Sequence, residues 1–349
     1  MRQETAHSGA RGARLSLWAP IEVSIALYGL LGSAFVVARF TVGERWRVVA
    51  FANNFIPWWA LAALAATLLA LPARRRWWLI PLQAPLLIAF VILYGDRFLP
   101  SRALEADDGA PELTVMTYNL QTRGTSASDL EVTIRALRPD VVGLQEFHRT
   151  HMDALAALED LYPHQMVHLS RQGVGMALLS RFPLSGQEAV NPSARYTRSI
   201  RARLDVDGTT IGVYLVHPDT PQNTYWPWSY DHSRRDRQLA EARTALAADD
   251  GPVLMLCDCN MSDQSDAYRA FDRLLDDSFR QAGQGLGFTF PAQLLPSSPS
   301  PVPLLRLDYI WHSEHFSTRQ ARVVRDHGTS DHYPVIARLV LNQRSTPDE

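Results

Sequence analysis

Residues 253–260 read VLMLCDCN, an apolar run that ends in polar side chains. Successive side chains of a strand point to opposite faces, so Asp258 and Asn260 share one face and Cys257 and Cys259 share the other. The apolar neighbours predict a buried strand, with the cysteines in the core and the polar pair in a candidate site. We expect no disulfide between the two cysteines, because both point the same way along extended backbone.

Other short apolar runs in this half of the chain also close on polar residues. They are predicted as buried strands at 113–120, 140–146, 175–180, 211–217 and 307–311. Helical patterns lie between several of them, at 128–137 and 233–247, the first with Ser128 or Asp129 as its cap. Strands that alternate with helices predict an α/β fold with a substantial sheet core.

The polar residues at the strand ends are candidates for chemistry. Glu146 closes VVGLQE and offers a carboxylate, the type of ligand that Mg²⁺ prefers. Asp331 and His332 are adjacent, and Asp308 is a second acid that could orient the histidine as an acid/base unit. Asn119 and His217 close two further strands, and each alone could equally be a satisfied polar residue at a strand end.

Seven blocks carry a resemblance to a known family. They are MTYNL at 116, VVGLQE at 141, GVGMALLSRFPL at 173, LVHPD at 215, CDCN at 257, RLDYIW at 306 and TSDHYPV at 329. Together they resemble the endonuclease/exonuclease/phosphatase superfamily, which includes deoxyribonuclease I, in its membrane-anchored bacterial form. The resemblance covers nearly all of residues 113–340 and implies a four-layer α/β/β/α sandwich with its active site at one end.

The resemblance also implies a divalent metal, normally Mg²⁺, with Mn²⁺ as a possible substitute. It makes Glu146 the principal metal ligand, assisted by Asn119 and Asp331. It makes Asp258 the group that positions or activates the attacking water. Asn260 would help to stabilise the phosphoryl transition state, and His217 would contact the phosphate or serve as an acid. His332, oriented by Asp308 or Asp331, would complete acid/base catalysis.

This sequence departs from the family at two places. Cys257 and Cys259 replace residues that are usually glycine and an aromatic or aliphatic side chain. His217 stands where the apurinic endonucleases carry tyrosine, so the chain looks more similar to the deoxyribonuclease and sphingomyelinase branches.

The N-terminal hundred residues predict a membrane anchor. Three apolar stretches, 17–38, 48–71 and 77–94, are each close to the roughly 20 residues that cross a bilayer, and tryptophans lie near their ends. Buried core helices are the alternative, and a cleaved signal peptide does not fit three successive stretches. The predicted organisation is an anchor over 1–99, a linker over 100–112, a catalytic domain over 113–340 and a tail over 341–349.

Arginine placement predicts the side of the membrane. The cluster at 74–76 and the arginines of the first 14 residues favour the cytoplasm, although Arg39, Arg45 and Arg47 favour the opposite arrangement. With three spans, this places the catalytic domain on the outer, periplasmic or extracellular side of the cell membrane. The bilayer and a phosphate-ester substrate are the expected partners, and no protein partner is predicted.

Charge bears on the substrate. Residues 105–349 hold 23 of the 34 arginines and 32 of the 36 acids, whereas a non-specific nuclease needs a basic surface. Arg201 and Arg203 lie in a local basic cluster that could grip phosphate or simply be exposed on an edge strand. The aromatic segment 225–230 could stack bases, touch lipid or pack against the protein itself.

The sequence therefore predicts a membrane-anchored, Mg²⁺-dependent phosphodiesterase, nuclease or phosphatase. Nucleic acid and lipid head groups are the candidate substrates. The alternative is a binding or signalling module that keeps this fold without activity.

Overall fold

The computed structural model describes residues 18–72, 74–99, 110–122, 124–190, 199–292 and 302–342. By its contacts the chain divides into two units, one made of Met1–Thr41 with Ile56–Ile92 and the other of Val42–Phe55 with Leu93–Glu349. Residues 42–55 and 93–99, which the sequence prediction includes in the membrane anchor, thus pack with the C-terminal unit.

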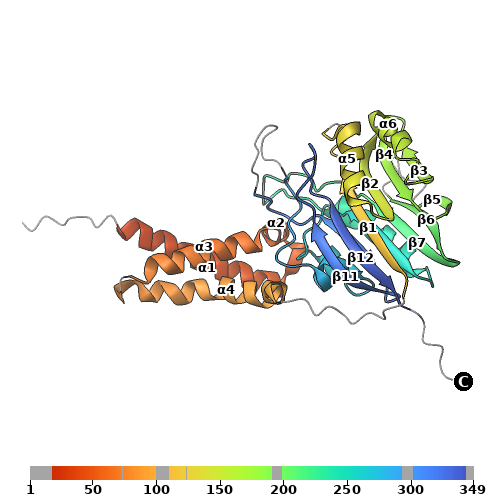
Figure 1. Cartoon of the computed structure of the whole chain (residues 1–349). Coiled ribbons are helices and arrows are strands. Elements are labelled where there is room, and N and C mark those ends of the chain that lie inside the picture. Colours follow the sequence, from red (N-terminus) through yellow and green to blue (C-terminus); the bar gives the residue numbers. More distant parts are fainter. Residues whose placement is uncertain are drawn as a thin grey trace, which may run out of the picture. The chain divides into compact units, whose positions relative to one another are not determined.

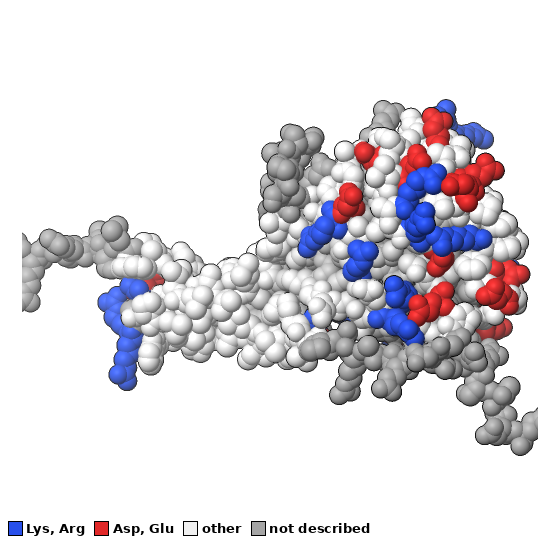
Figure 2. All heavy atoms as spheres, viewed as in Figure 1, with Lys and Arg blue, Asp and Glu red and all other residues white. Residues whose placement is uncertain are grey.

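The first unit consists of apolar helices. They are α1 (Trp18–Thr41), α3 (Ile56–Ala70), the 3₁₀ helix η2 (Arg74–Leu79) and α4 (Ile80–Tyr94). Within the described residues, Trp18–Thr41 and Arg74–Phe98 are long and apolar enough to cross a membrane. On the face that Figure 2 shows, these helices are almost free of charge except at one end. Arg75 and Arg76 pair with Glu22 at 3.1 and 3.0 Å.

The second predicted span, 48–71, is wrong as a single helix. It is broken into α2 (Arg47–Asn53) and α3, which meet at an angle of 76° and count as a third span only if the bent pair is taken together. Pro57 explains part of the break, because it has no N–H to continue the hydrogen-bond ladder of α2. Asn53 instead donates its side-chain amide to Glu44, at 3.1 Å.

The second unit contains two mixed six-stranded sheets, ordered β11-β12-β1-β2-β4-β3 and β5-β6-β7-β8-β10-β9 (Figure 1). The first sheet comprises β1 (Glu112–Asn119), β2 (Val141–His148), β3 (His164–Leu169), β4 (Val174–Ser180), β11 (Phe316–Val323) and β12 (Val335–Leu341). The second comprises β5 (Leu184–Ala189), β6 (Ser199–Val206), β7 (Thr209–Val216), β8 (Val253–Asp258), β9 (Asp276–Asp277) and β10 (Asp308–His312).

Three apolar clusters define the layers. One fills the space between the sheets and includes Val115 of β1 and Leu256 of β8. Another joins the first sheet to α5 (Ala127–Leu137) and α6 (Met152–Ala157), and a third joins the second sheet to α7 (Ser233–Ala247) and α8 (Asp266–Phe271). The order helix, sheet, sheet, helix confirms the α/β prediction and is consistent with the expected sandwich.

Local sequence accounts for the helix ends and the close approach of the sheets. Helix α5 begins after Ser126, whose hydroxyl accepts the N–H of Asp129, so the cap lies earlier than either predicted residue, Ser128 or Asp129. In β2, a Cβ at Gly143 would lie 2.7 Å from Leu256 and 2.8 Å from Leu215 of the opposite sheet. Only glycine lets the two sheets approach this closely there.

Segments 42–55 and 93–99, which adjoin the apolar helices in the chain, both contact one loop of the second unit, residues 260–266. Glu44 accepts the backbone N–H of Asp266 at 2.9 Å, at the start of α8. On the other side, the Tyr94 hydroxyl donates to Asp263 at 3.0 Å and Arg97 approaches the same carboxylate at 3.6 Å. Both Asp263 and Arg97 are buried.

A second buried ion pair, between Arg306 and Asp277, should stabilise the fold. Arg306 lies 2.5 Å from Asp277, both side chains are almost fully buried, and Tyr268 also donates to Asp277 at 2.7 Å. Replacing Asp277 with asparagine should lower the free energy of unfolding by about 3–5 kcal/mol, because it leaves the Arg306 charge buried without its partner. Chemical denaturation at pH 7 measures this.

The pH dependence of that loss has a definite sign. Burial raises the pKa of Asp277, but Arg306 outweighs it and holds the pKa below its ordinary value. The ion pair therefore stabilises the fold fully above the ordinary pKa of Asp, and this contribution is lost as pH falls through the lowered pKa. Asp272→Asn, which breaks an exposed pair with Arg280, is the control, and a loss as large as that of Asp277→Asn would contradict the role of burial.

Candidate functional site

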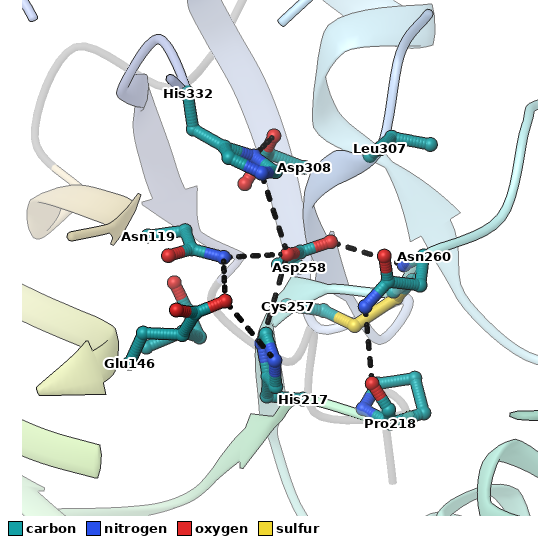
Figure 3. A network of polar contacts seen from close by, with 12 residues as sticks. Asn119, Glu146, His217, Pro218, Cys257, Asp258, Asn260, Leu307, Asp308 and His332 are labelled. Carbon is teal, nitrogen blue, oxygen red and sulfur yellow. Dashed lines mark hydrogen bonds and ion pairs between the residues drawn. A yellow bond between two sulfur atoms is a disulfide. The ribbon is translucent and has the colours of Figure 1, made fainter. Parts of the chain in front are cut away.

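Strand alternation brings four of the predicted residues to one end of the space between the sheets. Leu254 and Leu256 of β8 face the inter-sheet core, so Asp258 continues that face where the strand ends. By the same alternation, Asn119 continues the inward face of β1 and His217 continues that of β7. Asp308, at the start of β10, lies on the same face as the inward-facing Ile310. Figure 3 shows their side chains converging.

Glu146 reaches the same place by a different route. Residues 142 and 144 of β2 face α5 and α6, so simple alternation would turn Glu146 away from the second sheet. The pairing of β2 with β4 shifts register between Leu144 and Phe147, and Glu146 adopts a left-handed backbone with φ 52°. This β-bulge redirects the carboxylate, and backbone strain of this kind is common at functional sites.

Asp258 is the centre of the polar network (Figure 3). The Asn119 amide donates to its Oδ2 at 2.7 Å and to Glu146 at 3.3 Å. His217 lies between the same carboxylates, with Nδ1 3.6 Å from Asp258 and Nε2 3.8 Å from Glu146. All four side chains are buried or half-buried, so their interactions are little screened by water.

His332 approaches Asp258 from the loop before β12. Its Nδ1 is 2.9 Å from Asp308, and its Nε2 is 3.8 Å from Asp258 and 3.9 Å from Asp331. Burial lowers the pKa of His332, but the Asp308 and Asp258 carboxylates outweigh this and raise it to about 10. The imidazole therefore carries a positive charge at neutral pH.

The acids of the site exceed its cations. Burial raises the pKa of Asp331, His332 opposes the shift, and the Glu146 and Asp258 carboxylates add to it, so that the pKa stays above its ordinary value. Asp258, Asp308 and His332 also place one potential ligand atom each within 4.8 Å of one another. A surplus of converging carboxylate oxygens fits a hard divalent cation, which would relieve their repulsion.

Asn260 lies just beyond β8, in a left-handed backbone with φ 47°, and its N–H donates to Asp258 Oδ1 at 3.0 Å. Its side-chain amide donates to the carbonyl of Pro218 at 3.0 Å. The strand thus ends two residues earlier than predicted, and the chain turns sharply.

That turn also corrects the expectation for the cysteines, because Cys257 and Cys259 form a disulfide. Their Cα atoms are 5.1 Å apart. Two residues of extended strand would separate them by about 6.6 Å. The bent backbone brings the two side chains within bonding distance.

The structure does not bring the two predicted substrate-binding arginines to this site. Arg201 lies in β6 and pairs at 2.6 Å with Asp249, which precedes β8 and so lies beyond the end opposite to Asp258. Arg203 is two residues further along β6 in the direction away from His217, opposite Gly212.

Sequence reasoning missed several residues that support the site. Thr122 donates to Glu146 at 2.6 Å, and Ser330 donates to the carbonyl of Asn119 at 2.7 Å while it accepts the N–H of His332. Phe290 packs on the imidazole of His332, with ring centroids 4.8 Å apart. Ser330 adjoins Asp331 in the block TSDHYPV and could have been found there, whereas nothing in the residues around Thr122 and Phe290 singles them out.

The Asp308 carboxylate should control the charge of His332. In Asp308→Asn we expect the pKa of His332 to fall, because the amide keeps the shape but not the charge that stabilises imidazolium. The basic limb of the pH profile of kcat/KM should move to lower pH. Asp276→Asn, an exposed acid in β9, is the control, and an unchanged limb in Asp308→Asn would contradict this account.

Comparisons with solved structures show a shared fold. An endonuclease/exonuclease/phosphatase family protein from Bacteroides thetaiotaomicron has a TM-score of 0.50 at 18% identity, and the match covers 69% of this chain and 99% of that chain. D. rerio TDP2 complexed with single strand DNA product has a TM-score of 0.53 at 16% identity, covering 66% and 99%. The human Nocturnin catalytic domain with bound sulfate anion has a TM-score of 0.51 at 17% identity, covering 68% and 97%.

No curated protein matches the chain. The model of one family, described as Endonuclease/Exonuclease/phosphatase, matches residues 116–332. All eight predicted catalytic and metal-binding residues lie in this range, with His332 as its last residue. Because this match covers more than half of the chain, the protein belongs to the endonuclease/exonuclease/phosphatase family, whose members hydrolyse phosphoester bonds.

Proposed function

We propose that this chain is a membrane-anchored, Mg²⁺-dependent phosphoesterase. One observation carries the proposal, namely the convergence of Asn119, Glu146, His217, Asp258, Asp308 and His332 from both sheets around one buried carboxylate. A binding module that had no chemistry to perform would have no need to gather this many charged groups at the cost of desolvating them. The inactive module remains the second candidate.

Glu146, Asn119 and Asp331 would hold the metal, which when bound withdraws negative charge from a phosphoryl oxygen. Mn²⁺ offers the same preference for oxygen ligands. The Asn119 amide fixes the carboxylates of Asp258 and Glu146 by donating to both.

The other residues act on water and phosphate. Asp258 accepts the proton of the attacking water, because its Oδ2 is the oxygen that several groups approach. His217 and Asn260 lie on either side of that carboxylate and would donate to phosphoryl oxygens. His332 carries its positive charge towards the developing negative charge and is a proton source for the leaving group.

Surface charge favours a lipid head group over a nucleic acid as substrate. Figure 2 shows acidic and basic side chains mixed over the visible face of the second unit. Nucleic-acid backbones are bound by clustered arginine and lysine, and the Arg201 guanidinium is already engaged by Asp249.

We place the catalytic unit on the outer side of the membrane. The Cys257–Cys259 disulfide supports this, because disulfides persist mainly in oxidising compartments. A reporter enzyme fused after Glu349 that folds only outside the cytoplasm should be active. Activity of a cytoplasm-only reporter at the same position would place the unit inside.

The decisive test is hydrolysis by the full chain in lipid nanodiscs. Plasmid DNA, sphingomyelin, phosphoinositides and a chromogenic phosphodiester are each assayed with Mg²⁺, with Mn²⁺ and with a chelator. We expect metal-dependent release from a lipid head group and from the chromogenic ester. Equal, metal-independent rates for the wild type and Asp258→Ala on every substrate would favour the inactive module.

A further inference from the structure

One loop of the second unit has an exposed aromatic surface that the proposed chemistry does not use. Residues 222–231 form a loop within the connection between β7 and α7, and the side chains of Tyr225, Trp226 and Trp228 are 87%, 57% and 67% exposed. The two tryptophan rings lie with centroids 5.3 Å apart. Soluble surfaces rarely expose aromatic side chains together in this way, so the cluster marks a contact surface.

Backbone hydrogen bonds hold the loop in a defined conformation. Gln222 and Asp231 exchange backbone hydrogen bonds of 2.8 and 3.0 Å, which close its base. Inside it, the N–H of Trp226 donates to Asn223 and the N–H of Ser229 donates to Trp226, each at 3.0 Å. The exposed rings are therefore presented by an ordered backbone, which lowers the entropy lost when they bind a surface.

Its base rests on the segment between two apolar helices. Tyr230 is buried, receives a hydrogen bond of 3.4 Å from the Asn54 amide and meets Phe51 edge to face at 5.8 Å. Asn54 is two residues before the first residue of α3. If α1 crosses a bilayer, segment 42–55 follows its last residue, Thr41, directly, so covalent continuity starts the segment at the membrane surface.

We propose that residues 222–230 dock on the surface of a phospholipid bilayer through Tyr225, Trp226 and Trp228. Tyrosine and tryptophan favour the interface between lipid head groups and hydrocarbon, where the ring is apolar and its polar tip stays wet. Residues 222–230 contain no charged side chain, so docking desolvates no ion. Trp46, in segment 42–55, is also 60% exposed.

The same chemistry argues against a nucleic acid on this loop. Platforms that stack bases pair their aromatic rings with a basic groove for the backbone. Residues 218–231 contain no arginine and two acids, Asp219 and Asp231. A bilayer therefore fits the loop better than a polyanion does.

Docking would bring one wall of the candidate site to the membrane. The loop begins five residues after His217, and Thr220, which lies between them, donates to the Asn260 side chain at 3.4 Å. The docking proposal itself stands on the loop and segment 42–55, whether or not the protein hydrolyses phosphoesters.

The test uses the full chain in nanodiscs with an environment-sensitive fluorophore on Thr224→Cys, since Thr224 is exposed beside the aromatic cluster and Cys257 and Cys259 are buried in their disulfide. Nitroxide-labelled phospholipids should quench this probe and unlabelled lipid should shift its emission to shorter wavelength. Val132→Cys, on an exposed apolar position of α5, is the matched site and should show neither effect.

A second variant tests whether the tryptophan rings, and not only the position of the loop, bring the probe to the lipid. Adding Trp226→Ser and Trp228→Ser to Thr224→Cys should lose most of the quenching without changing the melting temperature, because both rings are exposed. Equal quenching at 224 and 132, or quenching that survives loss of both tryptophans, would overturn the proposal. So would a response to oligonucleotide, or to added unlabelled protein, in place of the response to lipid.

Discussion

Replacing Asp258 with asparagine should reduce kcat for phosphoester hydrolysis by about 10²–10⁴-fold, the usual contribution of a positioned base. The variant keeps the size of the side chain and can still accept the N–H of Asn260, so the fold should survive. It loses the negative charge that faces Asn119, His217 and His332. A single-turnover assay with the chromogenic phosphodiester measures the effect on the chemical step.

Glu159→Gln is the control for this change, because Glu159 is an exposed acid after α6. Its rate should equal that of the wild type. Should Asp258→Asn retain full activity with an unchanged melting temperature, Asp258 would not be the base, and the proposed division of roles among the site residues would have to be abandoned.

Glu146→Gln should have the second large effect, on metal binding. Losing one of the few carboxylates that a magnesium site uses should weaken the affinity for Mg²⁺ by at least about tenfold, since the amide oxygen carries no net charge. Titration calorimetry measures the affinity directly. The metal should also raise the melting temperature of the wild type more than that of the variant, because it binds only the folded state.

The Thr122→Val variant provides a graded comparison. It removes the hydroxyl that donates to Glu146 but leaves the carboxylate in place, so its affinity for Mg²⁺ should fall less than that of Glu146→Gln. Equal affinities for wild type and Glu146→Gln would mean that the metal is held elsewhere, for example by Asp258, Asp308 and His332.

Much of the fold follows from local sequence. Helix α7 begins and ends where its pattern predicts, at Ser233 and Ala247, because amphipathic periodicity over fifteen residues is a strong signal. The inward-facing positions of Asp258 and His217 follow from strict strand alternation beside an apolar core. The predicted strands reappear with ends that shift by one or two residues, which is the usual uncertainty of such boundaries.

Other features depend on partners that lie far away in the sequence. The bulge at Glu146 arises from the register of β2 against β4, and nothing inside VVGLQE indicates it. The Cys257–Cys259 disulfide needs the turn at Asn260, which strand alternation does not contain. The break between α2 and α3 depends on Glu44 and Tyr230, which give Asn53 and Asn54 alternatives to a continuous helix.

The loop 260–266 has a practical consequence for making a soluble enzyme. A fragment that starts at residue 105 would lack Glu44, Tyr94 and Arg97 and would leave Asp263 as a buried acid without its two partners. Burying an uncompensated carboxylate is costly, so the loop beside Asn260 would rearrange. Truncation at the end of the apolar helices would therefore weaken the enzyme for structural reasons, and low activity of such a fragment would say nothing against its chemistry.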